Sequence, residues 1–168
     1  MNPQNQEIKR ITQESIAIAA YQILVSREDL SITAICNRAG VSRNAFYRNF
    51  ETTDAVIFHY LKIGWEEYTK ESHVYDNSKE DVTLHLVRYF HQKQDLLRAL
   101  KKRNMLYIME MVFMNILIPE SEDVVGGARY LLYTTAFAMY GFVRAMIDND
   151  FSDSPEDIAK MSHQKISL

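Results

Sequence analysis

Turn-forming residues are scarce in this 168-residue sequence, which contains five glycines and three prolines. Short strands joined by tight turns need many such residues, so the scarcity favours helices. The single cysteine, Cys36, excludes an internal disulfide and a cysteine-based zinc site. The sequence also has no strand-like alternation of useful length, no repeat and no low-complexity segment. We therefore predict an all-α protein.

Long apolar runs are also missing. The first ten residues, MNPQNQEIKR, have no apolar core, so we do not expect a signal peptide. The uncharged stretch 130–143 is bracketed by Arg129 and Arg144 and is shorter than the ~18 residues that a membrane-spanning helix needs. We expect it to form a buried or interface helix, in a cytoplasmic protein.

Apolar residues recur at helical spacing through most of the chain. Ser31, Ser42, Thr52 and Ser154 are suited to cap helices, since a side-chain oxygen at that position accepts from a free backbone N–H. Two domains are expected, a small one over 1–50 and a larger helical one over 51–168. The expected helices cover 5–25, 31–38, 42–50, Thr52 to beyond Tyr68, Val82 to Leu97, 105–118 (apolar on all sides and therefore buried), the acidic 120–123 to about Ile147, and the segment after Ser154.

One stretch stands out against the acidic background of the chain, which carries a net charge of −3. Residues 31–50 hold three arginines and no acidic residue, so the rest of the chain carries −6. Gly40 can take a positive φ and turn the chain sharply between the helices expected at 31–38 and 42–50. The small Cys36 lets these helices cross closely. The pattern is typical of a helix–turn–helix.

The second of these helices has two distinct faces. Phe46 and Phe50 lie on the inward face, while Asn44, Ala45 and Arg48 point outward and are flanked by the side chains at 43, 47 and 49. Arginine reads guanine in the major groove, asparagine reads adenine, and a methyl group contacts thymine. Hydroxyl groups such as those of Ser31, Ser42 and Tyr47 bond to phosphates. The alternative is a solvated helical hairpin whose arginines have no role.

The segment SITAICNRAGVSRNAFYRNF resembles the N-terminal domain of TetR/AcrR-type transcriptional regulators. Phe46, Cys36 and Ala45 replace the usual Leu, Ala and Thr of that pattern, and Asn44 replaces a frequent glycine. Thr53 stands where the family commonly has a phosphate-binding lysine. The residues that agree with the family pattern are Ile35, Ala39, Gly40, Val41, Ser42, Tyr47 and Phe50.

The resemblance implies a fold and a function. Three N-terminal helices would bind DNA, and the larger helical domain would bind a small-molecule inducer and form a homodimer through about 122–148 and 155–166. Binding to a palindromic operator and release by the inducer would make the protein a repressor. The positions that the resemblance places on DNA are Ser31, Thr33, Ser42, Arg43, Asn44, Ala45, Tyr47, Arg48 and Asn49.

Bulky apolar and aromatic residues are frequent in the middle helices. Ligand pockets are mostly apolar, so the resemblance suggests an inducer site among these residues, although we expect most of them to be ordinary core. The small residues Gly126, Gly127, Ala128 and Gly141 permit close helix approach, which fits either a dimer interface or burial within one subunit. The candidate ligand-binding residues are Trp65, Tyr68, Tyr89, Met109, Phe113, Tyr133 and Phe137.

Catalytic and metal-binding patterns do not stand out. The five histidines form no HExxH or similar pair, and no Ser-His-Asp order, phosphate loop or paired carboxylate is recognised. We expect no enzyme activity, no metal and no cofactor, with a small helical enzyme as the remote alternative. A protein-binding co-regulator with weak DNA affinity is the second alternative, because Thr53 replaces the lysine. Cys36 is expected to pack between two helices rather than to act as a redox sensor.

Overall fold

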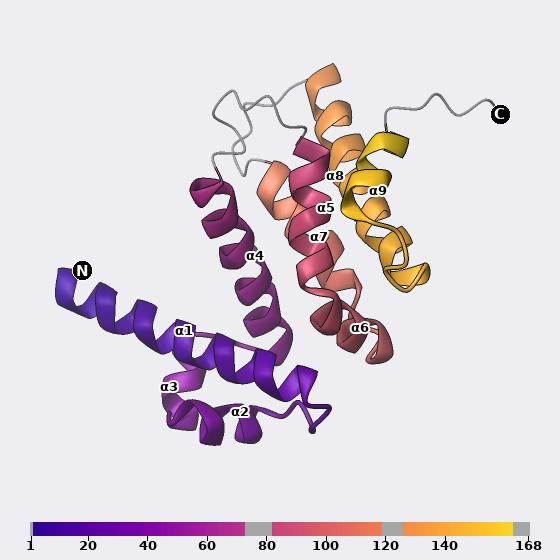
Figure 1. The fold of residues 1–168 in the computed structure, drawn as a ribbon. Helices are drawn as coiled ribbons and strands as arrows, with labels where there is room; N and C mark the ends of the chain where they lie inside the picture. Colours follow the sequence, from indigo (N-terminus) through magenta and orange to yellow (C-terminus); the bar gives the residue numbers. More distant parts are fainter. Residues whose placement is uncertain (1, 73–81, 119–125, 163–168) are drawn as a thin grey trace. The chain divides into compact units, whose positions relative to one another are not determined.

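The computed structural model describes residues 2–72, 82–118 and 126–162. Within these ranges the chain forms nine helices, α1 to α9, and no strand, which confirms the predicted all-α class. The chain divides into two compact units, Met1–Ile63 and Gly64–Leu168, and we describe each unit by itself. The helices of both units are labelled in Figure 1.

Unit 1 contains α1 (Pro3–Val25), α2 (Ile32–Ala39), α3 (Arg43–Tyr47) and the first half of α4 (Thr53–Glu71). α1 packs against α2, and α2 packs against α3. Each helix turns an apolar face inward, because its apolar residues recur at the helical period. The fully buried side chains of this unit include Ile16, Ile23, Leu24, Ile35, Phe46 and Ile57.

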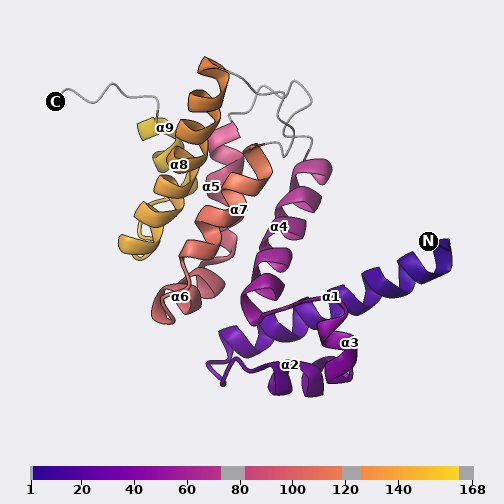
Figure 2. The same ribbon diagram turned by 180° about the vertical axis from the view of Figure 1, so that it is seen from behind.

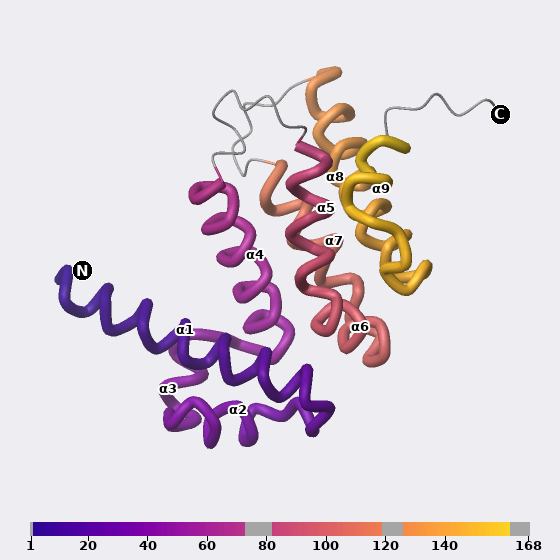
Figure 3. Tube along the Cα trace, in the orientation of Figure 1, coloured from indigo at the N-terminus to yellow at the C-terminus, as the bar shows by residue number. Residues whose placement is uncertain are grey.

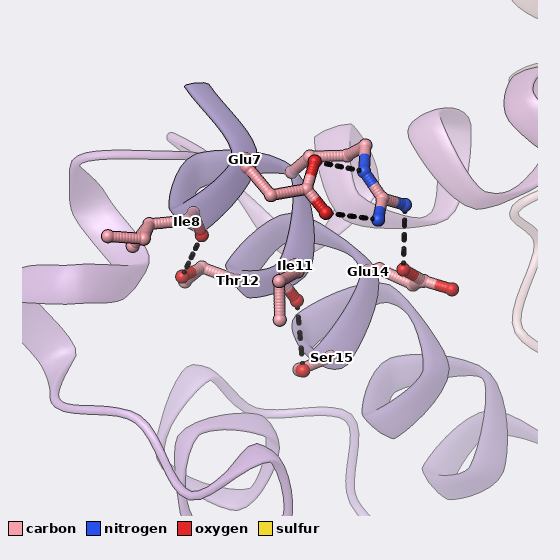
Figure 4. A network of polar contacts seen from close by, with 7 residues as sticks. Glu7, Ile8, Ile11, Thr12, Glu14 and Ser15 are labelled. Carbon is pink, nitrogen blue, oxygen red and sulfur yellow. Dashed lines mark hydrogen bonds and ion pairs between the residues drawn. The ribbon is translucent and has the colours of Figure 1, made fainter. Parts of the chain in front are cut away.

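None of residues 2–15 in the N-terminal half of α1 is buried, so packing against a core does not stabilise this half. It is stabilised instead by bonds between its own side chains and backbone. Arg10 bonds to Glu7 at 2.7 Å and to Glu14 at 3.2 Å, which are its neighbours one turn away on the helix surface (Figure 4). Thr12 and Ser15 donate their hydroxyl hydrogens to carbonyl oxygens one turn earlier, at 2.7 and 2.9 Å. These local bonds stabilise a helix that extends beyond the core of unit 1.

The boundary between the units lies inside α4. The backbone N–H of Ala55 donates to Thr52 Oγ1 at 3.1 Å, which confirms the predicted cap. The Tyr60 ring stacks on the Tyr21 ring of α1, with centroids 4.9 Å apart. The first half of α4 therefore belongs to unit 1, which ends at Ile63, whereas the sequence analysis divides the chain at residue 50.

Unit 2 contains the second half of α4, then α5 (Val82–Gln92), α6 (Gln94–Lys102), α7 (Tyr107–Leu117), α8 (Gly127–Asp148) and α9 (Pro155–Ser162). α8 packs along α7 and also contacts α5 and α6 (Figure 2). α9 runs back along α5 (Figure 3). One stripe of α8 supplies core residues to this unit, namely Ala136, Met139, Val143, Met146 and Ile147.

The turn between α8 and α9 is built by local bonds and by two basic side chains of α6. The backbone N–H of Asp157 donates to Ser154 Oγ at 3.2 Å, which confirms the predicted cap. Arg98 binds Asp150 at 2.9 Å and Lys101 binds Asp148 at 3.0 Å. These cations lie at the negative end of the α8 dipole, where positive charge is stabilising.

Two helix predictions are wrong. The helix expected from Val82 to Leu97 is divided at Lys93, because a continuous helix would place the polar Lys93 and Gln94 on the apolar stripe between Phe90 and Leu97. α7 is not buried on all sides, since Met111 is 51% exposed. The loop predicted at 76–81, Pro119 and the acidic helix start at 120–123 lie outside the described residues.

Candidate nucleic-acid interface

Two serines and a glycine shape the connection between α2 and α3. The backbone N–H of Ala34 donates to Ser31 Oγ at 3.2 Å, and that of Ala45 donates to Ser42 Oγ at 3.1 Å. Gly40 has a φ of +67°, and the Val41 N–H closes the turn on the Cys36 carbonyl at 3.0 Å. This left-handed position favours glycine, so the structure confirms both predicted caps and the predicted turn.

Apolar side chains behind the turn hold the two helices together. Cys36 is buried, at 3% exposure, as packing between two helices would require, and burial raises the pKa of its thiol. Phe46 and Phe50 are both buried, with ring centroids 6.2 Å apart, as expected for the inward face. The short α3 is therefore anchored by its aromatic residues, and its opposite face is left open.

The open face of α3 carries four polar side chains that the sequence analysis places on DNA. Arg43, Asn44, Tyr47 and Arg48 are all exposed. Together with Ser42, the last three of these line an open depression on the surface of unit 1. Thr33 is also exposed, on α2. The structure therefore brings a hydroxyl, an amide, a phenol and guanidinium groups together on one short helix and its cap.

Three of the expected DNA-facing residues are less exposed than the others. Ser31 is half-buried as the cap of α2, and Ala45 is half-buried in α3. Asn49 does not flank the outer face as expected, because its side-chain amide turns back and donates to the Ala45 carbonyl at 2.8 Å. Asn49 therefore supports the end of α3. The asparagine side chain is short enough to reach the carbonyl one turn earlier, but the sequence pattern gave no signal that separates this role from DNA contact.

The positive charge of the interface is smaller than the residue count suggests. Arg38 binds Glu28 at 2.8 Å, and Ser26 also donates to Glu28 at 2.8 Å. The hydrogen bond from Ser26, followed by that from Arg38, lowers the pKa of the Glu28 carboxyl. Neither Arg43 nor Arg48 forms an ion pair with a described residue, so these two arginines carry the uncompensated charge of this face.

The residues after α3 reduce the charge further. The Thr53 hydroxyl donates to the Asp54 carboxylate at 3.3 Å, and Glu51 lies exposed beside this pair in the sequence. Residues 1–63 contain seven Lys and Arg against six Asp and Glu, a net charge of +1. Residues 64–168 contain twelve Lys and Arg against sixteen Asp and Glu, a net charge of −4. Unit 1 is thus the more positive unit, by a small margin.

The candidate ligand-binding residues of unit 2 separate into two groups. Trp65 and Tyr89 are buried and lie edge to face, with centroids 5.3 Å apart, and Tyr68 stacks on Trp65 at 5.7 Å. Met109 and Phe113 are fully buried on α7. The core of unit 2 therefore contains this first group except for Tyr68, which is half-buried at its edge.

The second group lies on α8, away from its core stripe. Tyr133 is half-buried, and Phe137 is 48% exposed, so Phe137 does not lie in the core of unit 2 with the buried candidates. The sequence analysis also gave no role to His85, a buried polar residue whose Nδ1 lies 3.2 Å from the Tyr68 hydroxyl. A histidine within an aromatic cluster could have been noted from the spacing of His85 and Tyr89, which share one face of α5.

The outer face of α8 is apolar and exposed. Tyr130 is 80% exposed and Leu131 is 68% exposed, and both lie on the side of the helix opposite the core stripe. The sequence from Tyr130 to Val143 carries no charge. This face combines two large side chains with several small ones, and we call it the α8 outer face: Tyr130, Thr134, Phe137, Ala138, Gly141 and Ala145.

The described part of the chain shows neither a metal-binding cluster nor a membrane-spanning helix. Residues 2–72, 82–118 and 126–162 contain no group of three His, Cys, Asp or Glu that could hold a metal ion. None of the described helices is long and apolar enough to cross a membrane. Comparison of the chain with protein-family models, curated proteins and solved structures found no match.

Proposed function

We propose that this protein is a TetR-like transcriptional regulator that binds a palindromic DNA operator as a homodimer and acts as a repressor released by a small-molecule inducer. The single observation that carries the proposal is the exposed polar face of α3. Arg43, Asn44, Tyr47 and Arg48 project from a helix whose opposite face is anchored by buried aromatic rings. α2, the turn at Gly40 and α3 together have the form of a helix–turn–helix. In such a motif the second helix enters the major groove.

The residue types on this face suit base reading. The N-terminal residues of a recognition helix contact base edges, and Arg43 and Asn44 are the first two residues of α3. An arginine pairs with guanine and an asparagine with adenine. The Tyr47 hydroxyl and the exposed Thr33 would bond to phosphates and fix the register.

The α8 outer face supports the dimer part of the proposal. Two half-site readers gain from twofold symmetry, since the operator then repeats the same contacts. The face offers large side chains at Tyr130 and Phe137 and small ones at Thr134 and Gly141, so two copies could interlock. α9, the second element of the proposed interface, packs on α5 within unit 2 and leaves Met161 51% exposed. Residues 122–125 and 163–166 of the expected interface lie outside the described residues.

An inducer would bind in unit 2. The aromatic cluster of Trp65, Tyr68 and Tyr89 with the buried His85 combines apolar side chains with a few polar atoms, which is the composition of ligand sites. A ligand that favours one arrangement of the two DNA-binding units over another would weaken operator affinity by a population shift.

The proposal is tested by selecting bound fragments from a random duplex pool at near-physiological salt. We expect a palindromic consensus sequence. Arg48→Ala and Tyr47→Ala should abolish its binding while the dimer persists in sedimentation analysis. Arg10→Ala is the matched control, since this arginine lies on exposed α1 within ion pairs of its own helix, and it should bind as wild type. Normal binding by both α3 variants would show that the assigned face is wrong.

A second candidate function is a protein-binding co-regulator of the same fold with weak DNA affinity. It is favoured by the small charge of unit 1 and by Thr53, whose hydroxyl is bonded to Asp54 where the family resemblance places a lysine. The same selection separates the two functions. Absence of any enriched sequence, together with retention of a defined protein partner by the immobilised chain, would favour the co-regulator.

A further inference from the structure

The end of α3 is closed by a side chain. The backbone N–H groups of Asn49 and Phe50 both donate to the Phe46 carbonyl, each at 2.8 Å. A regular helix would instead send the Asn49 N–H to the Ala45 carbonyl. That carbonyl accepts from Asn49 Nδ2 at 2.8 Å, so the side chain replaces the missing backbone bond. The bond lies one residue beyond Arg48 and two beyond Tyr47.

We infer that Asn49 is a positioning residue for DNA binding, which holds the last turn of α3 and with it the side chains of Tyr47 and Arg48, and does not itself contact the bases. The inference rests on the proposed DNA-binding function. It differs from the expectation drawn from the sequence, which placed Asn49 on the DNA-facing surface. A helix of five residues has few backbone bonds of its own, so one bond at its end matters for the direction of the side chains beside it.

The burial of the amide supports this role. Asn49 Oδ1 is buried and has no hydrogen-bond partner. The Ala45 carbonyl can only accept, so the amide must present its NH2 group to it, and the oxygen is left inside. An amide that read adenine would need both its donor and its acceptor free to face the groove. In Asn49 the donor is used and the acceptor is covered.

The chain itself suggests a matched pair of variants. Thr12 and Ser15 in α1 donate hydroxyl hydrogens to carbonyls four residues earlier (Figure 4), which is the same spacing as Asn49 to Ala45. Asn49→Ser keeps a side-chain donor for the Ala45 carbonyl, whereas Asn49→Ala removes the donor and adds no charge. Operator affinity of the full-length protein is measured for both variants, on the selected sequence and on all its single base-pair changes, at several salt concentrations.

Asn49→Ala should weaken binding about fivefold, as loss of one hydrogen bond of ordinary net strength would. It should weaken every operator variant equally and leave the salt dependence unchanged, while Asn49→Ser should bind within about twofold of wild type. Arg48→Ala, by contrast, should leave no measurable binding to any of these operators, because the Arg48 side chain itself contacts the DNA. If Asn49→Ala relaxes preference at one base pair, or if it binds as wild type, the inference is overturned.

If the wild-type protein selects no DNA sequence, that result refutes the proposed function but not the role of Asn49 in holding the end of α3. A second measurement then tests the role of Asn49. Amide hydrogen exchange then compares the variants. The Arg48, Asn49 and Phe50 amides, which close the last turn, should exchange faster in Asn49→Ala than in wild type and Asn49→Ser. Equal exchange in all three proteins would overturn the positioning role.

Discussion

Gly64 and Tyr89 provide the sharpest prediction about the core of unit 2. Gly64 lies inside α4, and a methyl group added there would sit 2.6 Å from the Tyr89 hydroxyl oxygen and 3.8 Å from the ring carbon that bears it. Tyr89 is only 5% exposed, and its ring packs against Trp65 and Phe90 at centroid distances of 5.3 and 4.9 Å. The ring therefore has little room to move away.

Two effects of opposite sign act on Gly64→Ala. Alanine favours a helix interior over glycine by about 1 kcal/mol, whereas overpacking a core costs about 1–3 kcal/mol. We expect a net loss of about 1 kcal/mol of unfolding free energy. In the Tyr89→Phe background the hydroxyl is gone, and the nearest remaining atom, at 3.8 Å, is at ordinary contact distance. Gly64→Ala should then stabilise the protein by about 1 kcal/mol, so the effect changes sign.

Urea unfolding followed by tryptophan fluorescence measures this cycle directly. Trp65 is the only tryptophan of the chain and lies in the same cluster. Tyr68→Phe is the matched control, because it removes a neighbouring hydroxyl that faces His85 and not Gly64. In that background Gly64→Ala should still destabilise. Stabilisation of the wild type by Gly64→Ala, or an equal effect in all three backgrounds, would refute the close contact.

Three further predictions concern single side chains. Burial, followed by the neighbouring Tyr21, raises the pKa of Tyr60 from 10 to about 12. Because Tyr60 ionises more readily in the unfolded chain, the free energy of unfolding falls as the pH rises from 10 to 12. Chemical unfolding in this pH range should show a smaller fall for Tyr60→Phe than for wild type. Ser154→Ala removes the cap of α9 and should cost about 1 kcal/mol in thermal unfolding, with Ser152→Ala, at an exposed position in the turn, as a near-neutral control. The Cys36 thiol, buried and with a raised pKa, should react with a charged disulfide reagent only as fast as unit 1 unfolds; rapid labelling of the native protein would contradict its position.

Local chemistry explains what the sequence predicted well. Ser31, Ser42 and Ser154 cap helices through bonds to residues three positions later, so all the information lies in a few neighbouring letters. The same holds for the Gly40 turn, which depends on one backbone angle. The inward faces of the short helices follow from helical spacing alone.

The features that the sequence did not predict depend on residues that are distant in the sequence, or on which of two possible hydrogen-bond partners a side chain takes. Arg38 counted as free charge until the structure placed it beside Glu28, ten residues earlier. The sequence did not show whether Phe137 faces the core or the solvent, because the stretch 130–143 of α8 carries no charge on any side. Asn49 suits DNA and a helix end equally well, and only the geometry of the Ala45 carbonyl decides between them.

The charges of unit 1 bear directly on how the proposed DNA binding would work. With Arg38 paired, Arg43 and Arg48 are the α3-face cations that can approach phosphates without breaking an ion pair, so one unit makes at most two phosphate contacts from this face, and fewer if Arg43 reads a base. Two such contacts would make the affinity of one unit fall about tenfold between 50 and 200 mM salt, and four contacts in a dimer about 150-fold. A single unit with so few contacts would bind weakly, and joining two units makes the second binding step intramolecular.

On this reasoning, a charge placed on the α8 outer face, as in Phe137→Glu, should abolish operator binding and leave α3 intact. A monomeric variant that kept wild-type affinity and the steep salt dependence would show that the binding does not depend on two units.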